Sequence, residues 1–178
     1  MHTTLDDASI HTAITALATA AARSTCAAKA VGCVICAETI HGTLYYSGYN
    51  TSVSGAVCTD LYQKRADGWY YKDHGIWLKD DTEQRHKLWS AQHEIHAEIM
   101  ALIRYDPVIT SSAVAFVTWS PCLDCCKSLI HAGITAIYYI YDYDHIAAAR
   151  SVCTECGVTI ERLDDKWVKI YNECKTGH

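Results

Sequence analysis

The chain contains 178 residues, half of them hydrophobic and one fifth charged, and carries a formal net charge of −5. This size and composition predict one soluble globular domain over residues 1–178, and an acidic balance without a basic stripe argues against a polynucleotide partner. The Ala-rich residues 13–22 are too short to span a bilayer and follow two acidic residues, so neither a membrane segment nor a signal peptide is expected.

The first half of the chain begins with a helical pattern over residues 7–22, where apolar side chains recur near helical spacing. Residues 31–36 form an apolar run typical of a buried strand, and residues 42–47 are expected to be its partner after a turn. Residues 51–85 are polar and aromatic without clear periodicity, so they are expected to be irregular. A segment this long is usually functional or an insertion, which we place around residues 51–91.

The second half of the chain alternates helices with strands. The expected elements, in chain order, are a helix over 92–104, a strand over 114–118, a helix over 122–132, a strand over 134–141, a helix over 145–155, a short strand over 158–160 and a helical tail from 166. Gly133 and Gly157 stand where two of these helices would end. The alternation predicts an α/β sandwich with a partly parallel sheet.

The most informative motif is His-Ala-Glu, followed 23 residues after Glu98 by Pro-Cys-Leu-Asp-Cys. A catalytic zinc takes three protein ligands and leaves its fourth position to water. His96, Cys122 and Cys125 can supply those ligands, which leaves Glu98 free to move protons. This pattern is the signature of zinc-dependent nucleobase deaminases, in which the activated water attacks the ring and the glutamate acts as general acid and base.

The local structure expected around this motif favours metal binding. Pro121 suits the first turn of a helix, where Cys122 and Cys125 share one face and the helix dipole favours their thiolate forms. His96 would open the other helix, and Glu98 in its first turn must bend toward the water on the metal. The alternative is a structural zinc with four protein ligands, for which the motif lacks the fourth donor.

The ten cysteines are not expected to form a disulfide scaffold. Without a signal peptide, and with metal-ligand spacing, they indicate a reducing compartment and therefore the cytoplasm. Cys33 and Cys36 stand three apart on a strand, so they face opposite sides and are assigned to the core. Cys126 is also expected in the core, and Cys153 and Cys156 are expected to be half-buried.

Several stretches resemble the deoxycytidylate (dCMP) deaminases, particularly those of phages, over most of the chain. The similar parts are residues 23–26, 31–32, 48–50, 58–60, 86–101, 120–125, 132–134 and 143–144. Glu-Ile-His-Ala-Glu at 94–98 and the Pro-Cys-x-x-Cys segment are highly specific for the deaminase superfamily. The long segment between Asn50 and His96 is more typical of the dCMP branch than of transfer-RNA adenosine deaminases.

This resemblance implies a cytidine-deaminase-like α/β/α sandwich with a five-stranded mixed sheet. It also implies hydrolysis of dCMP to dUMP and ammonia, which feeds thymidylate synthesis, with Asn50, Ala97 and Tyr143 in contact with the substrate. Asn50 can alternatively be a turn residue. Alternation places Tyr143 on one face with Tyr139 and Tyr141, so part of this set is sheet packing.

Some phage-type members carry a structural zinc held by two cysteines, a histidine and a glutamate. The matching residues here are Cys26, Cys58, His86 and Glu94. All four residue types are correct, a carboxylate oxygen is an acceptable zinc ligand, and such a zinc would fasten the insertion to the core. The alternative is that Cys26 and Cys58 are buried small hydrophobic residues and that His86 is an exposed residue at a helix start.

The resemblance further implies regulation and assembly. Many members carry Gly-Tyr-Asn-Gly-x-Pro-x-Gly, a loop linked to activation by dCTP and inhibition by dTTP, with Mg²⁺ accompanying the bound nucleotide. Here, within residues 48–55, Thr51 replaces a glycine and Val53 replaces the proline, so the loop must take a different path or tolerate strain. Members are commonly homo-hexamers, and a phage-encoded member would act in the host cytoplasm.

Two other functions stay open at this point. One is deamination of another cytosine or adenine nucleoside substrate, against which the long insertion and the acidic balance weigh. The other is a catalytically silent, nucleotide-binding regulator, against which the intact Glu98 weighs. The groups that would hold a 5′-phosphate are not assigned, and Arg23, Lys29 and Lys127 are candidates by position.

Overall fold

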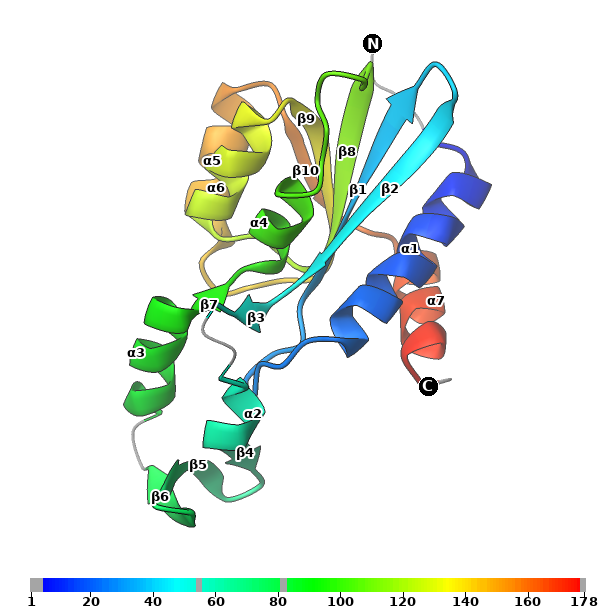
Figure 1. The fold of residues 1–178 in the computed structure, drawn as a ribbon. Coiled ribbons are helices and arrows are strands. Elements are labelled where there is room, and N and C mark those ends of the chain that lie inside the picture. The colour runs from blue at the N-terminus through cyan, green and yellow to red at the C-terminus, as the bar shows by residue number, and fades with distance from the viewer. Residues whose placement is uncertain (1–4, 54–55, 81–82, 177–178) are drawn as a thin grey trace.

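The computed structural model describes residues 5–53, 56–80 and 83–176. Its centre is a five-stranded sheet with strand order β10-β9-β8-β1-β2, covered by helices on both faces (Figure 1). This arrangement confirms the predicted α/β/α sandwich. Within the described ranges, no helix combines the length and the apolar composition that crossing a membrane requires.

The central sheet is mixed. β1 (Gly32–Thr39) forms a hairpin with β2 (Gly42–Tyr49) and also pairs antiparallel with β8 (Ser112–Trp119). β8 pairs parallel with β9 (Ile134–Tyr141), and β9 pairs parallel with β10 (Thr159–Arg162). Parallel neighbours need long crossovers, and a helix supplies each of them here.

The helices form the two outer layers (Figure 1). α1 (Asp7–Ala22) and α7 (Asp165–Thr176) pack together on one face. α4 (Ala97–Leu102), α5 (Leu123–His131) and α6 (Ile146–Glu155) cover the other face. The helices predicted over 7–22, 122–132 and 145–155, and the helical tail, are therefore confirmed to within one or two residues.

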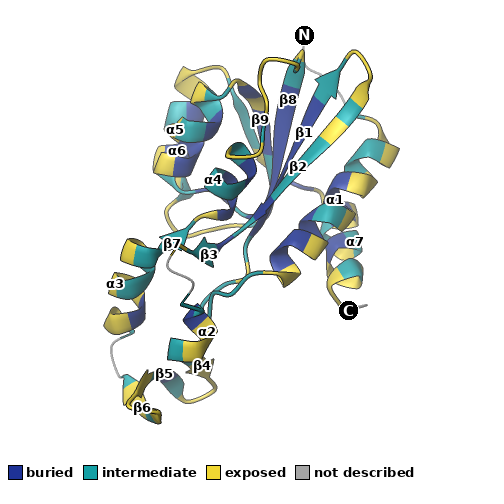
Figure 2. Cartoon of the chain, viewed as in Figure 1, coloured by how far each residue is buried: buried dark blue, intermediate teal, exposed yellow. Residues whose placement is uncertain are grey.

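Strand alternation divides the core between these two layers, and the central strands are the most buried part of the molecule (Figure 2). Cys33 packs with Cys126 and Cys153 under α4, α5 and α6, whereas Cys36 packs under α1 and α7. The prediction that Cys33 and Cys36 face opposite sides is confirmed. Cys153 is buried and Cys156 is exposed, so the prediction that both are half-buried is wrong.

Helix α4 lies directly on β2 because Gly48 has no side chain. A Cβ atom at Gly48 would lie 2.2 Å from the carbonyl oxygen of Ala97 and 2.4 Å from the amide nitrogen of Ala101. Such distances are far inside van der Waals contact, so any other residue would push the helix away. This close approach fixes the first turn of α4 against the end of β2.

The helix predicted over residues 92–104 is wrong in its extent. The structure instead has α3 (Gln84–His93), the short strand β7 (Glu94–Ile95) and then α4. Glu94 has extended backbone angles (φ −89°, ψ 134°) because β7 pairs antiparallel with β3 (Thr51–Ser52). Long-range pairing therefore interrupts a stretch whose local pattern is helical.

The prediction that residues 51–85 are irregular is also wrong. They contain β3, α2 (Cys58–Leu61) and a three-stranded antiparallel sheet of β4 (Tyr62–Arg65), β5 (Gly68–Asp73) and β6 (Ile76–Asp80). We call residues 62–80 the arm, because they project away from the sandwich (Figure 1). The turn between β5 and β6 has positive φ at both central residues, 47° at His74 and 84° at Gly75, as a tight hairpin requires.

Candidate active site

The predicted zinc ligands lie where two neighbouring helices begin. His96 is the N-cap of α4 (φ −69°, ψ 151°), and Cys122 is the N-cap of α5 (φ −71°, ψ 166°). Cys125 follows in the first turn of α5. Pro121 therefore precedes the cap and does not lie in the first helical turn as predicted, because the helical backbone begins only after Cys122.

These three side chains converge on one point. The Nδ1 atom of His96 lies 3.3 Å from the Sγ atom of Cys125 and 3.6 Å from that of Cys122. With zinc bonds of about 2.0–2.3 Å, a nitrogen and a sulfur ligand of a tetrahedral zinc lie about 3.5 Å apart. The residues present therefore fit a zinc ion, with three donor atoms that all lie within 4.8 Å of one another.

The electrostatics of the group favour the metal-binding form of one cysteine. The pKa of the Cys122 thiol is lowered to about 4, first by its hydrogen bond with Cys125 and then by His96. The hydrogen bond with Cys122 in turn raises the pKa of Cys125, and it raises that of His96 to about 9. A thiolate is thus stabilised at Cys122, and a bound cation would displace the protons that Cys125 and His96 hold.

Glu98 lies beside this group without belonging to it. Its side chain is 4% exposed, in the first turn of α4. Burial is the main cause that raises the pKa of its carboxyl group. A buried carboxyl group with a raised pKa binds a proton more readily than an exposed one, which suits a group that must accept and return protons.

A cavity of about 380 Å³ opens above these residues. Its volume lies within the range of small-molecule sites. His96, Glu98 and Cys122 line it, together with the three residues predicted to contact the substrate, Asn50, Ala97 and Tyr143. The structure therefore brings the predicted ligands, the predicted acid and base, and the predicted substrate contacts to one cavity.

Asn50 is buried and its side chain fastens the loop that precedes β1. Its Oδ1 atom accepts hydrogen bonds from the Ser24 hydroxyl and from the amide of Val31, and its Nδ2 atom donates to the carbonyl of Lys29 at 3.0 Å. These bonds use one of the two Nδ2 hydrogens. The geometry thus combines a structural role in the loop with a position on the cavity wall.

Tyr143 lies two residues beyond the end of β9, so strand alternation does not reach it. Its backbone amide donates to the Ser120 hydroxyl at 2.7 Å, and its ring is 42% exposed and faces the cavity. Tyr139 is fully buried and donates to Asp142, whereas Tyr141 packs against Tyr171 of α7. The prediction that the three tyrosines share one face is wrong, because the strand ends before the third.

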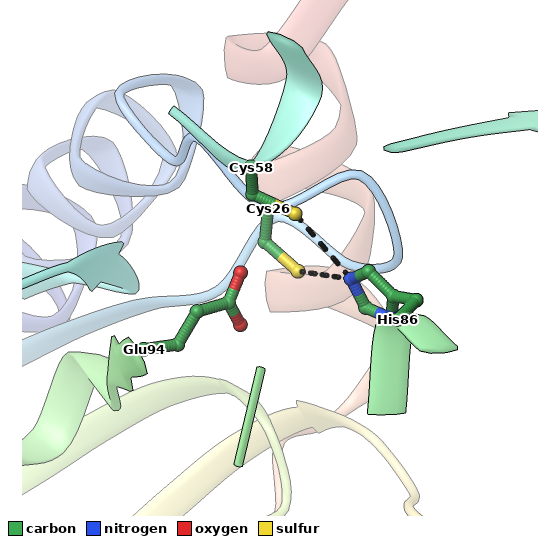
Figure 3. Close-up of side chains that lie close together, drawn as sticks. All are labelled: Cys26, Cys58, His86 and Glu94. Carbon is green, nitrogen blue, oxygen red and sulfur yellow. Dashed lines mark hydrogen bonds between the residues drawn. The ribbon is translucent and has the colours of Figure 1, made fainter. Parts of the chain in front are cut away.

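Figure 3 shows a second group of donors, three of which line the same cavity as His96 and Cys122. It contains Cys26 from the loop after α1, Cys58 from α2, His86 from α3 and Glu94 from β7, with one donor atom of each within 4.8 Å of the others. The Nε2 atom of His86 lies 3.4 Å from the Sγ atom of Cys58 and 3.9 Å from that of Cys26. The four residues thus join segments that are far apart in the sequence.

The surroundings of this second group also suit a cation. Among the described residues, the Oε1 atom of Glu94 is a buried oxygen without a hydrogen-bond partner, while its Oε2 atom accepts from Ser90 at 2.7 Å. The pKa of Cys26 is lowered to about 3, first by its hydrogen bond with Cys58 and also by His86. An orphaned carboxylate oxygen facing a stabilised thiolate is a site that a zinc ion would complete.

The arm packs against this group through aromatic rings. The indole of Trp69 stacks on the imidazole of His86 with 4.5 Å between ring centroids, and the ring of Tyr62 meets the same imidazole edge-on at 5.4 Å. Trp69 is 6% exposed and His86 is 4% exposed. The alternative that His86 is an exposed residue is therefore wrong.

Sequence reasoning missed the arm's contribution to the cavity. Lys64 and Trp69 line the cavity from the arm, and Trp119 lines it from the end of β8. The His74–Gly75 pair between two aromatic runs is a hairpin signal that could have revealed the arm. Nothing in the local pattern could have shown that two residues of the arm line the same cavity as His96 and Cys122.

Comparisons with known proteins agree with this geometry. Residues 6–141 match the family model described as the cytidine and deoxycytidylate deaminase zinc-binding region. ComE operon protein 2 of Bacillus subtilis is 33% identical over 159 residues, which cover 87% of this chain and 72% of that protein. The deoxycytidylate deaminase of Enterobacteria phage T2 is 30% identical over 142 residues, which cover 68% of this chain and 73% of that enzyme.

Solved structures show the same fold. The dCMP deaminase of cyanophage S-TIM5, solved in complex with dCMP and dUMP, superposes with a TM-score of 0.59 at 21% sequence identity. The superposition covers 90% of this chain and all of that one. At this identity, the likeness concerns the arrangement of the sheet and the helices.

Proposed function

The chain belongs to the cytidine and deoxycytidylate deaminase family, and we propose that it hydrolyses dCMP to dUMP and ammonia. The observation that carries this proposal is the convergence of His96, Cys122 and Cys125 beside a buried Glu98 on one cavity. The phage relatives, which are named deoxycytidylate deaminases, support dCMP as the substrate. The product would supply thymidylate synthesis.

In this mechanism the chain supplies the zinc ligands, a carboxyl group that carries protons, and the residues that line the substrate cavity. A zinc ion bound by the three donors would act as a Lewis acid that activates water near neutral pH. The Glu98 carboxylate takes one proton from the attacking water and delivers it to N3 of the cytosine ring; it then carries the remaining proton of the new C4 hydroxyl group to the amino group, which departs as ammonia while the C4 carbonyl forms. Burial of Glu98 favours its protonated state between these transfers, because the same burial raises its pKa.

Three wall residues are proposed to position the substrate. The other hydrogen bonds of the Asn50 amide hold its side chain against the loop. Its second Nδ2 hydrogen is not used by these bonds and is available to a nucleoside oxygen. The backbone of Ala97 lies between the metal ligand and Glu98, where the pyrimidine edge would meet it. The ring of Tyr143 offers a flat, half-exposed surface at the cavity mouth.

The second donor group is proposed to hold a structural zinc. The unpartnered Oε1 atom of Glu94 and the spacing of Cys26, Cys58 and His86 support it. Metal analysis of the purified protein would give two zinc ions per chain, and Cys58→Ser would reduce that number to one. A wild-type content of one, unchanged by Cys58→Ser, would contradict the second site.

Regulation, assembly and location stay proposals from the family resemblance. They comprise control by dCTP and dTTP with Mg²⁺, assembly into a homo-hexamer, and a cytoplasmic location. Directly after Asn50, Thr51 and Ser52 form β3 and pair with β7; Ser54 and Gly55 lie outside the described residues. If dCTP or dTTP binds at this loop, it would therefore meet the extended backbone of Thr51 and Ser52.

The direct test is an assay of ammonia release from dCMP, CMP, cytidine and deoxycytidine. We expect a strong preference for dCMP, and Glu98→Gln should retain zinc while losing about 10²- to 10⁴-fold in kcat, the usual contribution of a general acid and base. Equal rates on cytidine and dCMP would remove the dCMP assignment. Binding of dCMP without turnover by the zinc-loaded wild type would favour a silent regulator instead.

A further inference from the structure

A lysine that lies close to two aromatic rings lines the active-site cavity. The Nζ atom of Lys29 lies 4.0 Å from the ring centroid of Trp119 and 4.0 Å from that of Tyr143. Cations bind the faces of such rings. Among residues 5–53, 56–80 and 83–176, none of the ion pairs within 4.0 Å includes Lys29, so the ammonium group has room for an anionic ligand.

The backbone fixes the position of Lys29. Its carbonyl accepts the hydrogen bond from Asn50, and the neighbouring amide of Val31 donates to the same side chain. Burial is the first cause that lowers the pKa of the Lys29 ammonium, so this charge has lost part of its water. A partly desolvated cation binds an anion more strongly than a fully hydrated one.

A second cation reaches the same cavity from the arm. Lys64 is an exposed residue of β4 that lines the cavity, and its Nζ atom lies 5.7 Å from the ring centroid of Trp69. Trp69 is held in turn by its stack on His86. The packing of the arm on His86 therefore places Lys64 on the wall of the cavity that Lys29 also lines.

Charges of both signs act on Lys29, and Lys64 is the cation among them. After burial, the charge of Asp144 has the largest effect on the pKa of Lys29 and raises it, whereas the repulsion from Lys64 lowers it and Glu83 raises it by less. Two ammonium groups from distant segments that face one cavity repel each other until an anion lies between them. A phosphate dianion suits such a pair, since it accepts charge-assisted hydrogen bonds from both lysines.

We propose that Lys29 and Lys64 together hold the 5′-phosphate of the substrate, and that the arm thereby selects nucleotides over nucleosides. This inference rests on the proposed function, because it assumes that the pyrimidine lies beside His96 and Glu98. With the base at that end of the cavity, the sugar passes Asn50 and the phosphate reaches the aromatic-held Lys29. Lys64 then approaches the phosphate from the opposite wall.

The test compares Lys29→Gln and Lys64→Gln with the wild type on dCMP and on deoxycytidine. For each variant, kcat/KM for dCMP should fall about 10- to 100-fold, the usual effect of losing one hydrogen bond to a charged group, mostly through KM. kcat/KM for deoxycytidine should stay within about 2-fold, because no phosphate is lost. Lys64→Arg should restore much of the activity on dCMP, because its charge is kept.

Lys79→Gln is the matched control on the same arm. Its ammonium group lies 3.8 Å from Asp67 and the residue does not line the cavity, so both substrates should behave as in the wild type. Calorimetric titration with dUMP and with deoxyuridine provides a second readout that needs no turnover. The two lysine variants should weaken dUMP binding alone.

The outcomes separate the two proposals. A wild-type enzyme that deaminates dCMP, with variants that lose nothing or lose equally on dCMP and deoxycytidine, overturns the phosphate pair and leaves the proposed function intact. A zinc-loaded wild type that does not deaminate dCMP overturns both. Loss confined to dCMP in Lys29→Gln but absent in Lys64→Gln overturns the arm's part in selection.

Discussion

Replacing Gly48 by alanine should move helix α4 and with it part of the active site. The position needs glycine for space, because the added Cβ atom would lie 2.2 Å from the Ala97 carbonyl and 2.4 Å from the Ala101 amide. Ordinary contacts begin near 3.4 Å, so the helix must retreat by about 1 Å. Both clashing atoms belong to the backbone, and no side-chain rotation can relieve them.

The size of the effect follows from that displacement. Overpacking a core typically costs about 1–3 kcal/mol and occasionally more, and a clash between two backbones belongs at the upper end, so we expect a loss of about 3 kcal/mol in the free energy of unfolding. The first turn of α4 carries His96 and Glu98. A misplacement of about 1 Å at reacting groups lowers the rate by about 100-fold, so kcat should fall by that factor in the folded variant.

Denaturant unfolding and steady-state kinetics on dCMP measure the two effects separately. Gly32→Ala is the matched control, because its Cβ atom would lie 2.8 Å from the Ala21 amide and the Leu17 carbonyl in α1, on the other face of the sheet. It should lose stability while keeping kcat within about 3-fold, because the catalytic geometry is untouched. Equal kcat losses in both variants, or a Gly48→Ala protein as stable and active as the wild type, would refute the reasoning.

Three further outcomes are expected. Removing zinc with a chelator should abolish deamination and lower the melting temperature, and Zn²⁺ should restore both; activity that persists in zinc-free protein contradicts the metal site. The ratio of kcat/KM on dCMP to that on deoxycytidine should fall as the pH rises through the pKa of Lys29, since only the protonated ammonium binds phosphate. Burial lowers that pKa, so the fall should begin below the ordinary lysine value of 10.5, and Lys29→Arg should remove the part of the fall that is due to Lys29. Leu129→Ala, at a fully buried position of α5, should cost about 2–5 kcal/mol of unfolding free energy in denaturant titrations, and a loss below about 1 kcal/mol would contradict its place in the core.

The sandwich could be predicted from the sequence because its strands and outer helices carry local patterns that agree with their final environment. Residues 31–36 are apolar throughout since both faces of β1 are covered. Gly133 and Gly157 end their helices with φ values of 86° and 69°, as their positions suggested. Where propensity, pattern and burial agree in this way, local reasoning suffices.

The arm could not be predicted in the same way because its stability does not come from a hydrophobic face of its own. Its strands carry lysines, arginines and aromatic residues on both sides. The sequence therefore shows neither the alternation of apolar residues that is typical of a strand nor the spacing that is typical of a helix. Arg65 lies over the ring of Tyr70 at 4.1 Å and Arg85 over that of Tyr71 at 4.2 Å. Contacts between cations and rings hold this sheet, and a hydrophobic pattern does not record them.

The metal ligands could be predicted by residue type and spacing. The extended segment β7, which separates α3 from α4, could not be predicted, and it has a chemical role. In a continuous helix, residues two apart point about 200° from each other, so Glu94 and His96 would face different directions. In extended backbone, residues two apart lie on the same side. Because β3 pairs with β7, Glu94 and His96 both face the cavity, one in each donor group. The same pairing therefore connects the zinc that would hold the arm to the zinc that would activate water, so a variant that breaks β3 should disturb both centres together.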